Sequence, residues 1–168
     1  IILDYEFCYM EQGQMLLQYN EKEFLCNPGD FLLICPGIPH RFQFLSPVVV
    51  IPHMHFDVTY DFFSEEVFIC FQDYPDLTAS QRQMIRKNVF PNQAYSPFLR
   101  ISEKEHFLDL VQRIIATRDP QSMECRINMM RLLEMMIRDN IADTSTHSSP
   151  NERIAQQVKS YIDANYHQ

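Results

Sequence analysis

The apolar and polar positions of residues 1–73 form short runs that are separated by turn residues. Most of these runs are rich in Tyr, Phe, Val and Ile, which favour extended backbone. The pattern predicts strands over residues 2–10, 14–19, 23–26, 31–35, 41–45, 48–57 and 67–72. Short strands with frequent turns are typical of an antiparallel sandwich or barrel rather than a parallel sheet with crossover helices.

The placement of glycine supports this interpretation. The chain has three glycines, Gly13, Gly29 and Gly37, and all of them fall between predicted strands. Glycine adopts positive φ at no steric cost, so it is a preferred residue of tight turns. The apolar run 31–35 lies between two Pro-Gly pairs and is too short for a stable helix, so we expect a buried strand there.

Helical periodicity begins after residue 101. Ser102 and Glu105 have the spacing of a capping box, in which each side chain bonds the backbone amide of the other position. Apolar residues at helical spacing follow at Phe107, Leu108, Val111, Ile114 and Ile115. Asp119 and Pro120 are predicted to close this helix and to open a second one, since proline is tolerated in a first helical turn.

The second predicted helix carries more apolar surface than one contact with a sheet would cover. One stripe repeats in steps of about four and three residues, at Met123, Ile127, Met130, Ile137 and Ile141, with Met129, Leu132, Leu133 and Met136 beside it. Large apolar side chains left in water are a liability, so we expect one stripe to pack on the sheet and the other on a second copy. The predicted dimerisation residues are Met123, Ile127, Met130, Leu133 and Ile137.

The remaining segments are less regular. Residues 74–99 contain several prolines, and a single short helix over residues 80–88 fits the pattern there. Residues 142–149 are small and polar, which is typical of a linker. Ser149 and Pro150 then predict the start of another helix, whose apolar stripe has no partner before the chain stops. From this stripe, and from a start without methionine, we expect the chain to be a piece of a longer protein.

Composition and charge restrict the function. The 168 residues have a formal net charge of −8 and no basic stripe, which disfavours DNA binding by this chain alone, because phosphate contacts dominate nucleic-acid affinity. No apolar run is long enough for a membrane span, so no membrane partner is expected. The five cysteines are odd in number and lack a CxxC pair, which favours buried thiols in a reducing cytoplasm.

Two segments resemble one protein family. Residues 27–40 read as Pro-Gly-Asp, an apolar strand, and Pro-Gly-Ile-Pro-His, which resembles the second cupin motif and the N-terminal sensor domain of AraC-type transcription regulators. Residues 153–166 resemble the first helix of the double helix-turn-helix domain of the same regulators. In that family the N-terminal part binds a small effector and dimerises, while the C-terminal part reads DNA.

The resemblance implies an α+β fold with four parts. Residues 1–100 are expected to form a cupin-like antiparallel β-barrel of jelly-roll type, and residues 101–141 a helical dimerisation hairpin. Residues 142–149 would be the linker, and residues 150–168 the start of a truncated DNA-binding domain. The implied function is effector sensing, with a sugar as one candidate, in a homodimer that contacts DNA only through the missing C-terminal domain. No catalysis and no cofactor are expected.

Candidate effector contacts follow from residue chemistry. His53, His55 and Asp57 share one side of a strand, since positions i and i+2 point the same way. Tyrosine, histidine and arginine suit a sugar or a small acid, and the candidate effector-binding residues are Tyr9, His40, Arg41, His53 and His55. Alternation separates Tyr5, Phe7 and Tyr9 from Glu6, Cys8 and Met10, but it does not decide which set faces the interior.

Two alternatives remain. The histidines His40, His53 and His55 would suit a metal-dependent cupin enzyme, because imidazoles at this spacing chelate Zn, Fe or Ni. Cupins that bind metal usually place their His-x-His upstream of the proline-glycine motif, whereas here it follows that motif. The other alternative is an oligomerisation module without an effector, in which the barrel interior is fully packed.

Overall fold

The computed structural model describes residues 1–58, 76–119 and 121–141, and it contains two small antiparallel sheets. One sheet has the strand order β4-β1-β6 and the other has the order β3-β2-β5. The strands are β1 (Tyr5–Tyr9), β2 (Met15–Tyr19), β3 (Lys22–Cys26), β4 (Phe31–Ile34), β5 (His40–Phe44) and β6 (His53–Phe56). Six of the predicted strands therefore form, and the one predicted over residues 67–72 lies outside the described residues.

The predicted glycine turns are confirmed. Gly13, Gly29 and Gly37 all have positive φ. At Gly13 a β-carbon would also collide with the carbonyl oxygen of Val48, so this turn requires glycine on both conformational and steric grounds.

One apolar core lies between the two sheets. It is built from side chains of both sheets: Ile2, Cys8, Met10, Met15, Leu17, Tyr19, Cys26, Leu32 and Ile34. Cys8 and Met10 therefore point toward this core, and the alternate positions of β1 point to the opposite face of its sheet. This resolves the question that alternation left open, because Glu6, Cys8 and Met10 face the interior between the sheets.

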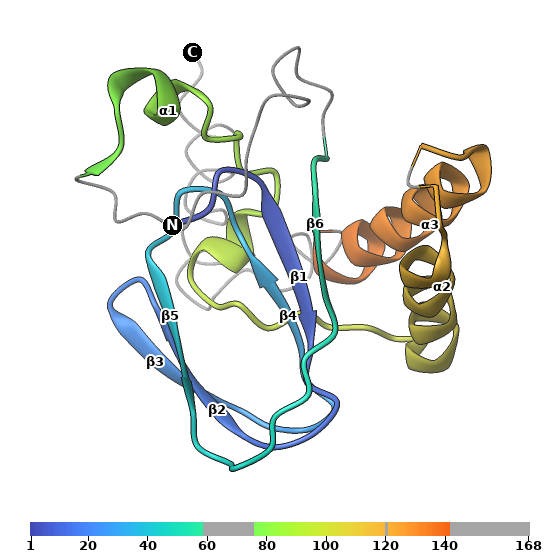
Figure 1. Cartoon of the computed structure of the whole chain (residues 1–168), viewed down its shortest axis with the longest axis horizontal. Helices are drawn as coiled ribbons and strands as arrows, with labels where there is room; N and C mark the ends of the chain where they lie inside the picture. The colour runs from blue at the N-terminus through green and yellow to red at the C-terminus, as the bar shows by residue number, and fades with distance from the viewer. Residues whose placement is uncertain (59–75, 120, 142–168) are drawn as a thin grey trace, which may run out of the picture.

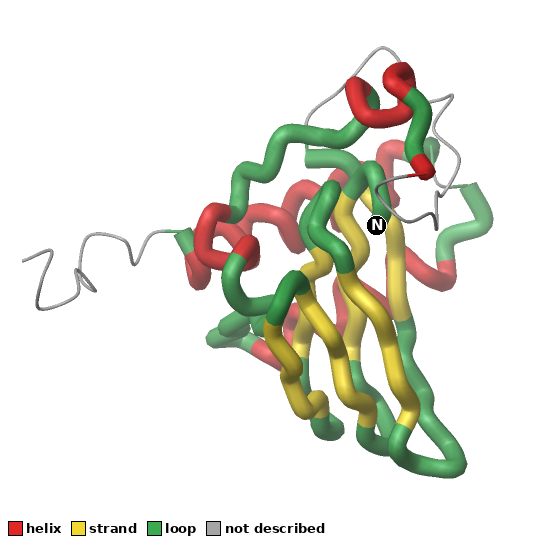
Figure 2. Tube along the Cα trace, turned by 90° about the vertical axis from the view of Figure 1, so that its left-hand side faces the viewer, coloured by secondary structure: helices red, strands yellow, loops and turns green. Residues whose placement is uncertain are grey.

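The opposite face of the β4-β1-β6 sheet is covered by helices (Figure 1). The helical elements are α1 (Ala79–Gln83), the 3₁₀ helix η2 (Pro91–Ala94), α2 (Lys104–Ala116) and α3 (Met123–Asn140). Figure 2 shows the strands running side by side with the helices gathered beyond and above them. The result is an α+β fold that is consistent with a cupin-like domain.

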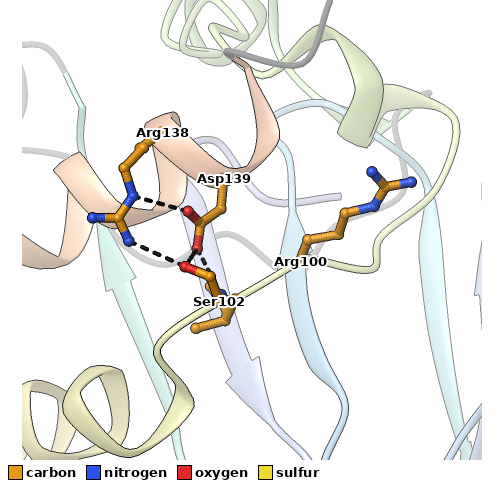
Figure 3. Close-up of a pocket in the computed structure, with 5 residues that line it drawn as sticks. Arg100, Ser102, Arg138 and Asp139 are labelled. Carbon is orange, nitrogen blue, oxygen red and sulfur yellow. Dashed lines mark hydrogen bonds and ion pairs between the residues drawn. The ribbon is translucent and has the colours of Figure 1, made fainter. Parts of the chain in front are cut away.

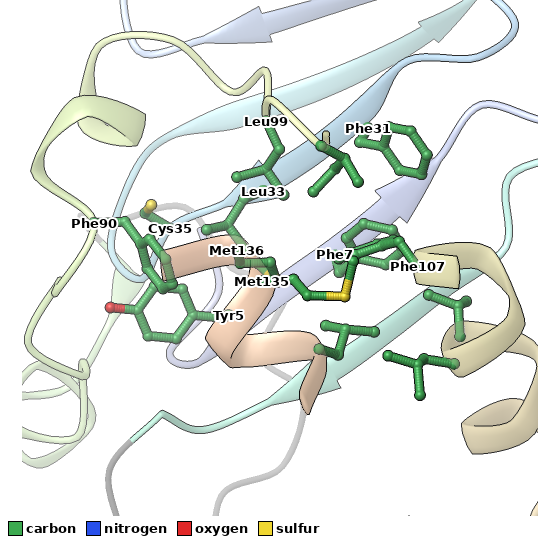
Figure 4. Close-up of a cluster of buried hydrophobic side chains, with 14 residues drawn as sticks. Tyr5, Phe7, Phe31, Leu33, Cys35, Phe90, Leu99, Phe107, Met135 and Met136 are labelled. Atoms are coloured by element: carbon green, nitrogen blue, oxygen red, sulfur yellow. The ribbon is translucent and has the colours of Figure 1, made fainter. Parts of the chain in front are cut away.

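A second core joins the helices to this sheet (Figure 4). Phe107 of α2 is fully buried, and its ring centroid lies 5.4 Å from that of Phe7 and 5.4 Å from that of Phe31. Leu132, Met135 and Met136 of α3 are buried in the same cluster, together with Tyr5, Leu33, Cys35, Phe90, Leu99, Ile101, Leu110 and Val111. Strand β1 is therefore buried on both faces.

The capping box predicted at Ser102 is wrong. Helix α2 begins at Lys104 with Glu103 as its N-cap, and no side chain bonds the cap. The Ser102 amide and hydroxyl instead donate to Asp139 Oδ2, at 2.7 Å and 2.8 Å. Ser102 therefore bonds the end of α3 instead of the first turn of α2. The spacing of residues along the sequence does not reveal this distant partner.

Two further helix boundaries differ from the prediction. Helix α3 begins at Met123 rather than at Pro120, because the Ser122 hydroxyl caps it by accepting the Cys125 amide at 3.2 Å. Helix α1 ends at Gln83 rather than near residue 88, and the Arg86 amide donates to the Leu3 carbonyl at 2.8 Å. That bond ties the segment after α1 to the N-terminus of the chain.

Candidate functional site

A small group of ionisable side chains interrupts the apolar interior between the sheets. In the register of β1 and β6, Glu6 lies opposite His55 and Cys8 lies opposite His53. Because Cys8 belongs to the core between the sheets, these four positions share the face that points to the other sheet. Glu6 is a charged residue in a strand whose neighbours Tyr5 and Phe7 are at most 1% exposed.

His55 is held between two carboxylates. Its Nδ1 lies 3.1 Å from Oδ1 and 3.2 Å from Oδ2 of Asp4, and its Nε2 lies 3.8 Å from Glu6 Oε1. The hydrogen bond to Asp4, together with the charges of both carboxylates, raises the pKa of His55, although burial opposes this. Burial raises the pKa of Glu6, and the nearby imidazoles of His55 and His53 oppose that shift.

The opposite sheet contributes His40. This residue lies opposite Tyr19 in the pairing of β2 with β5, and Tyr19 is buried between the sheets, so His40 faces the same interior. Its Nδ1 lies 2.9 Å from the Ile38 carbonyl. Burial lowers the pKa of His40, and the charge of His55 contributes in the same direction. The two imidazoles therefore approach from opposite sheets, one favouring the neutral form and one the charged form.

The structure brings some of the predicted effector residues together and separates others. His40, His53 and His55 face the interior between the sheets, although His53 is exposed and its Nδ1 lies 3.2 Å from the Ile51 carbonyl. Tyr9 lies on the helical side of β1 with its ring stacked on Phe31 at 5.0 Å. Arg41 lies on the outer face of β5 opposite Gln18 and is exposed.

The sequence pattern does not identify Asp4 or Glu6 as site residues. A charged residue inside the run Tyr-Glu-Phe-Cys-Tyr was the available signal for Glu6. Asp57 was grouped with the histidines, but in the structure it accepts a hydrogen bond from Arg86 Nε at 3.0 Å. No group of three His, Cys, Asp or Glu side chains that would suit a metal ion occurs within residues 1–58, 76–119 and 121–141.

A chain of hydrogen bonds connects the sandwich interior to the end of α3. The Tyr19 hydroxyl accepts the Cys35 amide at 3.2 Å and donates to the Gln93 carbonyl in η2 at 2.9 Å. The side-chain nitrogen Nε2 of Gln93 donates to Asn140 Oδ1 at 3.5 Å, and the backbone amide of Arg100 donates to the same oxygen at 2.9 Å. Asn140 Nδ2 donates to the Arg100 carbonyl at 2.9 Å, so the last residue of α3 is clamped on both sides.

A second polar cluster fixes the same end of α3 from outside (Figure 3). Arg138 Nε donates to Asp139 Oδ1 at 3.0 Å, and Arg138 Nη2 donates to the Ser102 hydroxyl at 3.2 Å. Because Ser102 also bonds Asp139, the segment before α2 and the last turn of α3 form one network. The segment before α2 and the last turn of α3 are therefore held together by side-chain hydrogen bonds.

The outward side of α3 is apolar. Met123 and Met130 are each 70% exposed, and Ile127 and Ile137 are 43% and 39% exposed. A groove open to solvent runs beside them and is lined by Val58, Met130, Leu133, Glu134, Ile137 and Arg138. Of the five predicted dimerisation residues, Met123, Ile127, Met130 and Ile137 are exposed, whereas Leu133 is half-buried and packs against the core of the helices and the sheet. We call these five residues the α3 stripe.

Comparison with known proteins gives one family match, which lies in the β-rich part of the chain. Residues 2–50 match the family model described as the AraC-like ligand binding domain. A search of the curated proteins found no match. Among the described residues, no helix is both long and apolar enough to cross a membrane. The matched region covers β1 to β5 together with Glu6 and His40, and it supports the N-terminal, effector-sensing domain of an AraC-type transcription regulator.

Proposed function

We propose that this chain is the sensing and dimerisation module of a bacterial AraC-type regulator in the cytoplasm, with a small polar effector bound between the two sheets. The observation that carries the proposal is the ionisable group formed by Glu6, His40 and His55 inside an otherwise apolar interior, within or beside the matched region. Buried polar groups of this kind are costly unless they serve a ligand or a network. DNA contact belongs to a further domain.

The proposed effector contacts follow the geometry. His40, His53 and His55 stay in the set because they face the interior, and Asp4 and Glu6 join them through their contacts with His55. Tyr9 and Arg41 leave the set because one faces the helices and the other faces outward. A polar effector, such as a sugar or another small polyfunctional molecule, matches donors and acceptors of this type.

The proposed signal runs from the interior to the end of α3. An effector that moves Tyr19 or the segment around Gln93 would alter the clamp on Asn140, because these groups are joined by successive hydrogen bonds. The residues after α3 form the proposed linker, so a change there would reposition the DNA-binding domains of a dimer. Allosteric couplings of this kind are typically worth about 1–3 kcal/mol.

The proposed dimer interface is the α3 stripe of two copies. Met123, Ile127, Met130 and Ile137 follow steps of four, three and seven residues, which is the seam of a coiled coil. A seam with this period fits another helix of the same period, and a second copy supplies one with two-fold symmetry. Glu134 also lies on the seam, and Arg138 Nη1 is 4.0 Å from its carboxylate, which offsets the charge.

A ligand screen tests the effector site. We expect one class of small polar compounds to raise the melting temperature saturably. At a ligand concentration of 100 times Kd, binding should raise the free energy of unfolding by about 2.7 kcal/mol. His55→Ala should abolish the shift, whereas Arg41→Ala, on the outer face of β5, should keep it. Elemental analysis of the same samples tests the alternative of a metal-dependent enzyme. About one transition metal per chain, lost in His53→Ala, would replace this proposal with the metal-dependent enzyme.

The path to α3 is tested by comparing two buried tyrosine hydroxyls. Tyr19→Phe should cost about 1–3 kcal/mol, because the Gln93 carbonyl and the Cys35 amide lose their partner. We also expect the Arg100 and Ile141 amides to exchange hydrogen faster than the loss in the free energy of unfolding alone would cause.

Tyr5→Phe is the matched control. The Tyr5 hydroxyl is also buried and bonds the same region, accepting the Val89 amide at 2.7 Å and donating to the Lys87 carbonyl at 3.1 Å. Among the contacts described, the Tyr5 hydroxyl has no bond to Gln93 or Asn140. In Tyr5→Phe, the exchange rate of the Arg100 amide should therefore change only as far as the free energy of unfolding changes. Equal effects of the two variants on Arg100 and Ile141 would rule out the path.

A further inference from the structure

Glu6 is a buried carboxylate, and one of its two oxygens has no hydrogen-bond partner among the described residues. The residue is 5% exposed, and one oxygen, Oε1, lies 3.8 Å from His55 Nε2. The other oxygen, Oε2, is buried and has no hydrogen-bond partner in the part of the chain that the structure describes. Buried carboxylates are normally paired or hydrogen-bonded, and an exception is a candidate for binding something that the protein itself does not supply.

Within the described residues, Glu6 has no cationic side chain dedicated to it. Four described ionisable side chains act on Glu6: His55, His53, Asp4 and Cys8, whose thiol hydrogen-bonds the carboxylate. His40 faces the same interior from the opposite sheet. His55 Nδ1 lies 3.1 Å and 3.2 Å from the two carboxylate oxygens of Asp4, whereas His55 Nε2 lies 3.8 Å from Glu6 Oε1. In the part of the chain that the structure describes, Asp4 and Glu6 therefore share the His55 imidazole, and Glu6 lacks a full counter-charge.

We propose that Glu6 Oε2 receives an ammonium group of the effector, so that the regulator senses a small amine. This inference rests on the proposed effector site between the sheets and specifies its ligand class. An ammonium group offers three donors and one positive charge, which match the unused oxygen and the missing counter-charge. The imidazoles of His40 and His53 are then placed to bond hydroxyl or further polar groups of the same molecule.

The same arrangement selects against acids. A carboxylate ligand entering this interior would approach Asp4 and Glu6 together, and like charges at short range in a buried site are strongly unfavourable. A neutral polyol would avoid that repulsion but would leave Glu6 without a counter-charge. The structure thus ranks amines above neutral polyols, and neutral polyols above acids, for binding at this site.

The test uses matched probes and the intact 168-residue chain. Isothermal calorimetry compares glucosamine with glucose, putrescine with 1,4-butanediol, and both sets with lactate. We expect saturable binding of at least one amine, with its hydroxyl counterpart at least tenfold weaker and no binding of lactate. Glu6→Gln, which keeps the shape and removes the charge, should weaken the amine at least tenfold.

Glu23→Gln is the control for loss of one carboxylate. Glu23 is an exposed residue of β3 that bonds Gln18 at 3.0 Å, and its substitution should leave amine affinity unchanged. Circular dichroism and the melting temperature of Glu6→Gln establish that this variant is folded. If it is not, Glu6→Asp replaces it, and the shortened side chain should likewise weaken the amine at least tenfold.

The outcomes separate this inference from the proposed function. Glucose, butanediol or lactate binding as tightly as the amines, with no effect of the Glu6 substitution, overturns the ammonium inference and leaves an effector site between the sheets intact. Binding of an amine that is unaffected by Glu6→Gln also overturns it. No saturable binding by any amine probe contradicts the inference outright, and a melting shift from a wider screen then decides whether the chain has an effector at all.

Discussion

Met130→Asp is expected to convert a dimer of this chain into a monomer, weakening self-association by about 100-fold or more. Met130 is 70% exposed at the middle of the α3 stripe, so the substitution leaves the folded monomer unchanged. In a two-fold interface the carboxylate enters twice, once from each copy, and each must be buried without a partner. Sedimentation velocity over nanomolar to micromolar concentrations measures the change.

Ile115→Asp is the matched control for this experiment. Ile115 is an apolar residue of α2 that is 54% exposed, and it does not belong to the α3 stripe. Its substitution adds the same charge to a comparable helix surface, so association should be unaffected. A wild-type chain that stays monomeric at micromolar concentration, or equal losses in the two variants, would remove the α3 stripe as the interface.

Phe107→Ala is expected to destabilise the chain by about 3–5 kcal/mol, the largest effect of any single substitution considered. Phe107 is fully buried between α2 and the β4-β1-β6 sheet, with its ring against Phe7 and Phe31. Truncation leaves a cavity at the point where the helical pair meets the sheet, and the rigid strands cannot close it. Urea denaturation followed by circular dichroism gives the free energy of unfolding.

Phe44→Ala provides the comparison. Phe44 is 61% exposed at the end of β5, so its loss should change the free energy of unfolding by only about 0.5 kcal/mol. If Phe107→Ala costs no more than Phe44→Ala, the helices and the sheet do not unfold as one unit. The proposed signalling from the interior to α3 would then be ruled out, because a loosely attached helix pair does not follow movements of the sheet.

Local chemistry explains why the strands and turns were predictable. Gly13, Gly29 and Gly37 all have positive φ, which glycine adopts at no steric cost, and the apolar runs between them favour extended backbone. The exposed stripe from Met123 to Ile137 was also predictable, since period and hydrophobicity together identify a seam. These features depend on neighbours within a few residues.

The candidate site was only partly predictable for the opposite reason. His40 and His55 were recognised by residue type, but Tyr9 and Arg41 were grouped with them although they lie on other faces. Period-two alternation identifies two faces without saying which is inside, and β1 is buried on both, so hydrophobicity did not distinguish them. Glu6 becomes notable only once its interior surroundings are known.

The sequence by itself determined the order of strands and helices, the positions of the turns, and the apolar stripe on α3, because each follows from propensity and periodicity along a short stretch. Tertiary structure decided which residues far apart in the sequence contact one another. Ser102 caps no helix because Asp139, far along the chain, accepts its amide and hydroxyl. Likewise, Asp4, Glu6 and His55 meet only because β1 pairs with β6. Contacts between distant residues depend on the register and packing of whole elements, which no local pattern encodes.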